Sequence, residues 1–112
     1  MDAAIDQTNL ITTETKLKGT VTFSGFTRFD GAIEGNIVGR PGSEIVLGET
    51  GVVEGQINGD LIIIDGFVRG DVEATGKIVL TETGRVIGTL KAPSIAISFG
   101  AFFEGSCETV TQ

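Results

Sequence analysis

The acidic side chains and the single cysteine are the residues of this chain whose types could do chemistry. Asp71 and Glu73 are two positions apart and could serve as a general acid and a general base. They alternate with Val72 and Ala74, which is typical of the solvated face of a strand, so we expect no catalytic role. The chain has no histidine, and this excludes a catalytic triad built on histidine and a histidine-ligated metal site.

The other candidates for ion, nucleotide or thiol chemistry have the wrong spacing or setting. Asp60, Asp65 and Asp71 lack the spacing of a calcium-binding loop, and no Gly-Lys-Ser/Thr phosphate-binding loop occurs. Cys107 falls at an inward position of a strand pattern, so we expect a small buried residue rather than a nucleophile. One cysteine excludes an internal disulfide and a cysteine-rich zinc site. We therefore expect no cofactor, no metal ion and no enzymatic activity.

The composition indicates one small folded domain. The 112 residues carry a net charge of −7, which gives no electrostatic reason to bind nucleic acid or an anionic membrane. The hydrophobic fraction of 40% is too high for a disordered chain, and the 17 glycines are too many for a helical one. No stretch approaches the roughly 18 apolar residues of a membrane-spanning helix. The acidic N-terminus does not resemble a secretory signal, so we expect a cytoplasmic protein.

The elements that must position these residues follow from a short repeat that runs along the whole chain. In each copy an apolar residue, a glycine two positions later and a second apolar residue two positions after that share one face of a strand. The period of 15 to 20 residues is too short to hold a crossover helix, so it predicts one turn of a solenoid of short parallel strands. The central glycines are Gly19, Gly35, Gly55, Gly70, Gly88 and Gly105.

Apolar residues of successive repeats are expected to stack in rows inside this solenoid. Each central glycine is expected at a tight bend, where a side chain would collide with the core. The first row is Leu17, Ile33, Val53, Val68, Val86 and Phe103, and the second is Val21, Ile37, Ile57, Val72, Leu90 and Cys107. A further strand in each turn is predicted from the alternating pairs Ile45/Leu47, Leu61/Ile63, Ile78/Leu80 and Ile95/Ile97.

The two ends of the solenoid carry the functional expectation. Each end exposes unpaired backbone groups and a cut through the core, which soluble repeat proteins usually cover with a cap. No segment of the sequence is a candidate cap, and six of the seven phenylalanines cluster towards the ends, at Phe23, Phe26, Phe29, Phe99, Phe102 and Phe103. Either these side chains plug the ends of a monomer, or two self-associating ends join rods lengthwise into a filament.

Several segments resemble the bactofilin family of bacterial cytoskeletal proteins. Residues 100–107 are similar to its closing motif, Gly-Ala-x-Phe-x-Gly-x-Cys, and residues 29–37 resemble its opening segment. Residues 66–74 and 88–93 resemble its central repeats, so that the resemblance covers residues 10–109. It implies a right-handed, triangular β-helix that forms nucleotide-independent, non-polar polymers. It also implies that Phe103 is the interface aromatic of the C-terminal end.

These observations predict an all-β, single-domain, right-handed parallel β-helix (a β-solenoid) of about six turns at residues 10–109, with short tails at 1–9 and 110–112. We expect a structural protein that assembles end to end into cytoskeletal filaments and scaffolds cell-shape or envelope proteins. The alternative is a monomeric or small-oligomer binding module for a protein or a glycan. The expected polymerisation interface comprises Phe103, Phe102, Phe99 and Cys107 at one end, and Leu10, Ile11, Phe23, Phe26 and Phe29 at the other.

The expected partners are further copies of the chain and, through the scaffold role, cell-wall enzymes or other envelope proteins. No nucleic-acid partner is expected. Many family members carry a hydrophobic or basic membrane-targeting segment at the N-terminus. Residues 1–9 are acidic here and do not support such binding. We expect a cytoplasmic location, and the alternative is a peripheral position at the inner face of the cytoplasmic membrane.

Overall fold

Every element of the computed structural model is a β-strand within residues 2–5, 9–11, 16–23 and 25–109, which are the residues that the structure describes. Repeated apolar and β-branched residues at alternate positions favour this extended structure, and glycines punctuate each turn. The strands are β1 (Asp2–Ile5), β2 (Asn9–Ile11), β3 (Lys16–Phe23), β4 (Phe26–Phe29), β5 (Ala32–Gly39), β6 (Glu44–Leu47), β7 (Val52–Ile64), β8 (Phe67–Leu80), β9 (Arg85–Ala92), β10 (Ser94–Ile97) and β11 (Phe102–Thr109).

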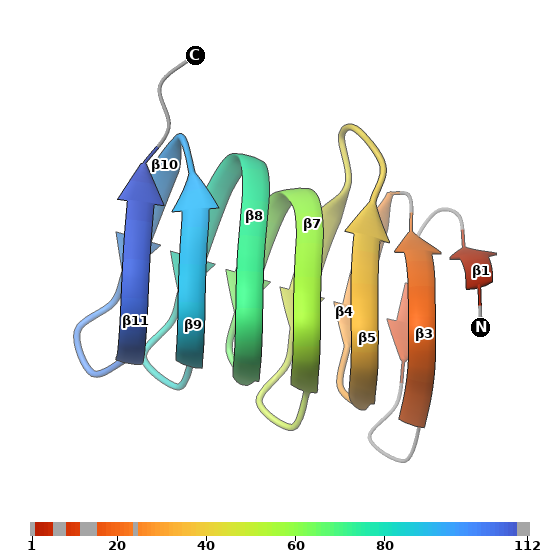
Figure 1. Ribbon diagram of the computed structural model, residues 1–112, viewed down its shortest axis with the longest axis horizontal. Coiled ribbons are helices and arrows are strands. Elements are labelled where there is room, and N and C mark those ends of the chain that lie inside the picture. The colour runs from red at the N-terminus through yellow and green to blue at the C-terminus, as the bar shows by residue number, and fades with distance from the viewer. Residues whose placement is uncertain (1, 6–8, 12–15, 24, 110–112) are drawn as a thin grey trace.

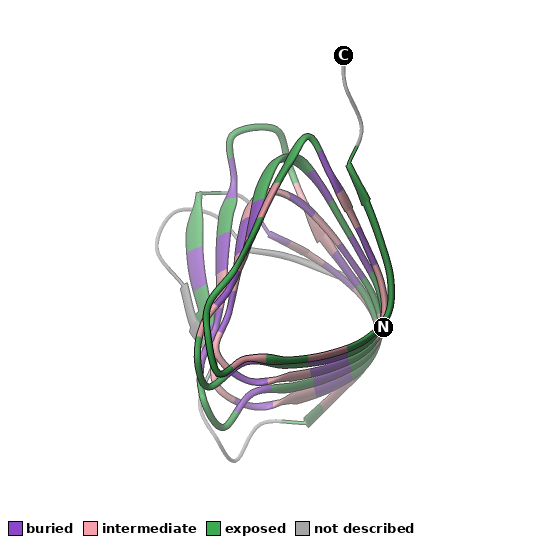
Figure 2. Cartoon of the chain, turned by 90° about the vertical axis from the view of Figure 1, so that its left-hand side faces the viewer, coloured by how far each residue is buried: buried purple, intermediate pink, exposed green. Residues whose placement is uncertain are grey.

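The strands coil into a parallel β-helix whose turns stack along one axis (Figure 1). The front strands run upwards, the chain crosses to the back at the top, and the coil advances from right to left, which is a right-handed path. The outline seen along the axis is triangular (Figure 2). The six central glycines enclose five successive turns, so the helix has about five turns where the sequence led us to expect six.

The register of the strands confirms the two predicted apolar rows. Parallel pairing aligns the first row from Leu17 to Phe103 and the second row from Val21 to Cys107. The inner members of both rows are buried, with relative exposures of 0 to 2%. Because each fully buried aliphatic side chain stabilises the fold by about 1.5–3 kcal/mol, this stacking is the main source of its stability.

The strand predicted from Leu61/Ile63 is present, but the neighbouring isoleucines are the residues that face the core. Ile62 and Ile64 are fully buried, whereas Leu61 and Ile63 are only partly buried. The register shifts between Gly59 and Leu61 at the corner of the triangle, and this reverses the alternation of the side chains that follow. All four residues at 61–64 are apolar, so the sequence does not show which of them face the core.

The central glycines lie at the expected bends, but the group that excludes a side chain there is backbone rather than core. Their φ angles lie between +104° and +144°, a region that residues with a Cβ rarely adopt. A Cβ at Gly70 would overlap the carbonyl oxygen of Gly55 one turn earlier, and the same holds from Gly35 to Gly105 along the ladder. The glycines therefore allow successive turns to approach to the normal strand spacing of about 4.8 Å.

The N-terminal region contains two strands where we expected a tail or an open end. β1 pairs with β3 and β2 pairs with β4, both in parallel. Residues 2–5 thus form a paired strand within the segment 1–9 that the sequence suggested as a tail. Residues 110–112, the expected C-terminal tail, lie outside the described residues.

Candidate polymerisation interface

The C-terminal end of the β-helix is an open edge. β11 pairs with β9 and β10 pairs with β8, and no described strand lies on the other side of either. In the turns beside these strands, the backbone N–H groups of Ser98 and Phe102 donate to Leu80 and Gly84 of the preceding turn. The last rung is therefore bonded on one side and leaves backbone groups on the other side for a further strand.

The rows of the core end in solvent at this edge. Phe103 aligns with the fully buried Val86 but is itself only partly buried. Ile97 aligns with the fully buried Leu80 but is 45% exposed. Figure 2, in which the C-terminal end faces the viewer, shows exposed residues along the nearest rung. No further strand among the described residues covers these side chains.

Cys107 is exposed, and the prediction of a buried cysteine was wrong. It does occupy the predicted inward row, because it aligns with Leu90, which is fully buried. Its exposure arises because no described strand follows β11 along the axis. Register alone placed the residue correctly, whereas burial depends on the neighbouring turn.

The other two C-terminal candidates lie away from the inward rows. Phe99 is fully exposed in the turn between β10 and β11, and Phe102 is 49% exposed in line with Arg85 on the outer surface. Ile95 and Ile97 belong to the open end but were not among the predicted interface residues. The signal that could have found them was present, since they are the last of the alternating apolar pairs.

At the opposite end, the structure places the predicted residues in two different layers. Leu10 and Ile11 lie in β2, at the register positions of Arg28 and Phe29. Phe29 is fully buried, as is Phe23, which aligns with Ile5 of β1. These two phenylalanines therefore lie one rung inside the end, because the pairing of β1 and β2 adds a layer that sequence reasoning missed.

Phe26 is the exception among the three N-terminal phenylalanines. It is 39% exposed, on the opposite face of β4 from the buried Phe29. The terminal rung itself consists of β1 and β2, each paired on one side only among the described strands. The residues at the N-terminal edge are thus Leu10, Ile11 and the members of β1.

The ion pairs among the described residues lie on the sides of the rod. The ion pair of Lys18 and Glu34 (3.9 Å between Nζ and Oε2) joins two turns through exposed side chains. Such a pair contributes little to stability, at most about 1 kcal/mol. The inward residues of the open C-terminal end, in contrast, carry no formal charge, which suits a dry contact with another apolar surface.

Neither a metal-binding cluster nor a membrane-spanning helix is found among the described residues. No group of three or more histidine, cysteine, aspartate or glutamate side chains in the described ranges could hold a metal ion. No helix long and apolar enough to cross a membrane is found in the same part of the chain.

Comparison with known proteins gives a consistent result. Residues 9–108 match the bactofilin family, which is described as polymer-forming and cytoskeletal. Bactofilin BacO of Myxococcus xanthus is 35% identical over 81 residues, which span 70% of this chain and 64% of BacO. Bactofilin BacP of the same organism is 33% identical over 84 residues, which span 70% of this chain but 35% of BacP. No solved structure matches the chain. The chain belongs to the bactofilin family, whose members are structural cytoskeletal proteins and not enzymes.

Proposed function

We propose that this protein assembles end to end into filaments through the two open ends of its β-helix. The observation that carries the proposal is the abrupt end of the buried rows, at Phe103, Cys107 and Ile97, in exposed apolar side chains. A second molecule stacked on this end continues the backbone pairing and covers the cut core. Burial of the apolar surface that is still exposed at this end favours association by about 25 cal/mol per Å².

Assembly at both ends gives an open polymer rather than a closed oligomer. The N-terminal edge, formed by β1 and β2, also lacks a second pairing partner among the described strands. Contacts between like ends, as the bactofilin family implies, need two different junctions that alternate along the filament. Because neither junction closes on itself as a ring, the product extends without limit.

The proposed biological role is a cytoplasmic scaffold that holds cell-shape or envelope proteins in place. The matched segment of this chain spans 64% of BacO and 35% of BacP. The partners of those proteins are therefore not assigned to this chain. A regular filament displays the same side surface once in every subunit. Any protein that binds this surface is therefore held in a repeating array.

Purified protein is expected to form filaments without nucleotide and without metal ions. The physical reason is that the contacts proposed at both ends are apolar side chains and backbone pairs, which need neither. Negative-stain electron microscopy and pelleting in EDTA, with and without ATP or GTP, measure this directly. A monomer at micromolar concentration in sedimentation experiments would favour the monomeric binding module, and a strict need for nucleotide would refute the mechanism.

A junction between two C-terminal ends is expected to be captured by cross-linking Cys107, the single cysteine of the chain. Two copies of the last rung then face one another, and a short bismaleimide joins them into a covalent dimer that grows no further. The dimer is measured on a denaturing gel after treatment of assembled filaments, with Cys107→Ser as the control. Filaments that yield no dimer would show that the C-terminal end contacts an N-terminal end instead.

A further inference from the structure

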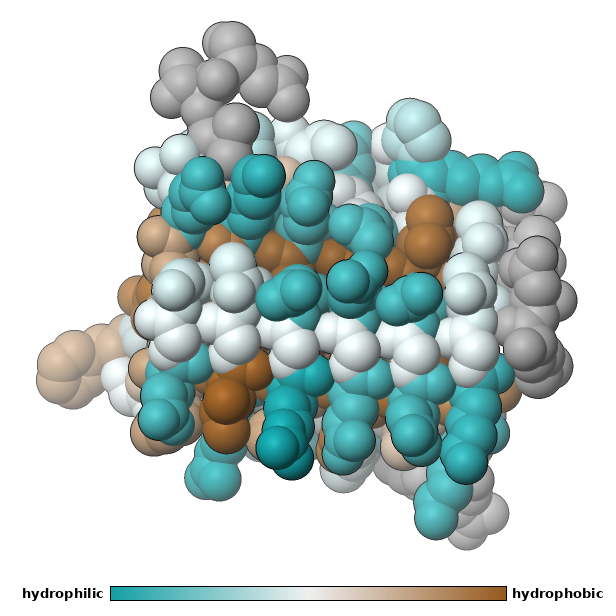
Figure 3. Space-filling view, viewed as in Figure 1, coloured by the Kyte–Doolittle hydropathy of each residue, from teal (hydrophilic) through white to brown (hydrophobic). Residues whose placement is uncertain are grey.

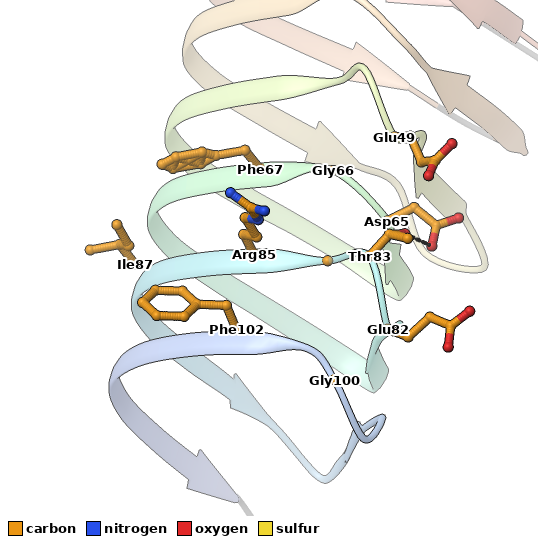
Figure 4. A pocket seen from close by; sticks show the side chains of 11 residues that line it. Glu49, Asp65, Gly66, Phe67, Glu82, Thr83, Arg85, Ile87, Gly100 and Phe102 are labelled. Atoms are coloured by element: carbon orange, nitrogen blue, oxygen red, sulfur yellow. Dashed lines mark hydrogen bonds between the residues drawn. The ribbon is translucent and has the colours of Figure 1, made fainter.

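A groove opens on the side of the rod, where the loops before β8, β9 and β11 lead into these strands. Its volume is about 840 Å³. Phe67, Ile87 and Phe102 extend along one wall with Arg85 among them, and the acidic side chains Glu49, Asp65 and Glu82 lie beyond the bend (Figure 4). This groove lies on the lateral surface, outside the rows that form the open end.

The apolar wall interrupts a polar pattern. Ile87 is 38% exposed and aligns with Arg69 on one side and Glu104 on the other. Every other member of this outward column is charged, and they are Lys18, Glu34, Glu54, Arg69 and Glu104. This isoleucine is not a member of the buried core. The front face in Figure 3 is largely hydrophilic, with strong hydrophobic colour reaching the surface over β9 and, farther from the groove, over β5.

Two aromatic residues extend the same wall along the axis. Phe67, Arg85 and Phe102 occupy one register position on consecutive rungs, so the arginine lies between two phenylalanines. The guanidinium group can stack on aromatic rings. No ion pair joins Arg85 to a carboxylate within the described part of the chain.

The three carboxylates of the acidic wall form no ion pair with any described residue, and hydrogen bonds hold one of them in place. The Asp65 carboxylate accepts hydrogen bonds from the hydroxyl groups of Thr81 and Thr83, the latter at 3.0 Å. Glu49 and Glu82 are exposed, and neither forms an ion pair with any residue that the structure describes. Three carboxylates on one rim of an apolar groove, in a protein of net charge −7, attract a cationic group.

We propose that this groove binds a short extended segment of another protein, in which apolar side chains stand next to a lysine or an arginine. The apolar side chains contact Phe67, Ile87 and Phe102, while the basic side chain meets Glu49 and Glu82. Two strand spacings separate the outer rungs, about 10 Å, which is the length of roughly three extended residues. The inference deepens the proposed scaffold role and rests on it, because it names the surface that recruits a client.

Two other occupants are disfavoured by charge. The N-terminal segment of the chain carries Asp2 and Asp6 and no base before Lys16, so the acidic rim repels it. A second copy of the chain brings another net charge of −7 to the same surface. A cationic segment from a different protein is the occupant that complements both walls.

The test uses the full chain and a fluorescent heptapeptide with two leucines, two positions apart, flanked by lysines. Fluorescence anisotropy is expected to show binding that falls about tenfold or more in Ile87→Ser and in the double variant Glu49→Gln/Glu82→Gln. The matched control Glu34→Gln/Glu54→Gln removes the same charge from exposed sites outside the groove and is expected to bind within about twofold of wild type. Peptides with glutamate for lysine, or serine for leucine, are expected to bind weakly.

Each other outcome overturns the proposal. Equal losses in the two glutamate pairs would mean attraction to the acidic protein as a whole. Filaments whose lateral association is lost in Ile87→Ser, with no peptide binding by wild type, would identify a second copy as the occupant. Binding to phosphatidylethanolamine–phosphatidylglycerol vesicles that depends on Ile87 would identify a membrane. Electron microscopy of every sample separates the two claims, since peptide binding without filaments contradicts the polymerisation proposal alone.

Discussion

Replacement of Phe103 by arginine is expected to abolish filament assembly while leaving the β-helix folded. The side chain is only partly buried in the single molecule, so an arginine there can reach solvent. In the proposed junction it would meet the apolar end of another subunit and lose its hydration without a partner. Burying an unpaired charge costs several kcal/mol, so we expect the critical concentration for assembly to rise at least about 100-fold.

Circular dichroism reports the fold of this variant, and pelleting with electron microscopy reports its assembly. Val52→Arg is the matched control, because Val52 is 36% exposed on the side of the rod and outside the proposed junction. The control is expected to fold and to polymerise as the wild type does. If Phe103→Arg forms filaments at the critical concentration of the wild type, the end-to-end proposal is wrong.

Replacement of Gly70 by alanine is expected to destabilise the fold by about 3–5 kcal/mol, which is a large part of the total for a small domain. Gly70 has a φ of +140°, and its added Cβ would overlap the carbonyl oxygen of Gly55. Backbone cannot move aside as a flexible side chain can. The two turns must separate, and the strand pairing on both sides of the glycine weakens.

Thermal unfolding followed by circular dichroism measures this loss, and a fall in Tm of about 15 °C or more is expected. Gly42→Ala provides the control, since Gly42 also has a positive φ of +83° but nothing lies within 4 Å of its added Cβ. Only the backbone strain remains there, about 1 kcal/mol. Equal effects of the two substitutions would show that strain, and not the contact between turns, is what requires glycine.

The order and alignment of the turns could be predicted from the sequence because each copy of the repeat places equivalent residues at the same point of a turn. Each glycine marks the same point of every turn, and the apolar residues two positions before and after it define both rows from Leu17 to Phe103 and from Val21 to Cys107. The alternation fails as a guide at residues 61–64, where four apolar side chains in succession allow either phase.

The position of the ends could not be predicted in the same way. β1 carries no glycine-centred copy of the repeat, yet it pairs with β3 and encloses Phe23. The lateral groove could not be predicted from the sequence either. Phe67 and Ile87 are 20 positions apart in sequence and come together through the stacking of turns. Neither feature has a local pattern that a single strand could reveal.

The sequence by itself determined a parallel coil of strands and the alignment of its two apolar rows, since periodicity is a local property of the chain. Only the tertiary structure decided which members of each row are covered. Burial depends on whether another turn follows along the axis, and for Cys107 and Phe103 none of the described strands does. The same row position is core in the middle of the rod and surface at its end.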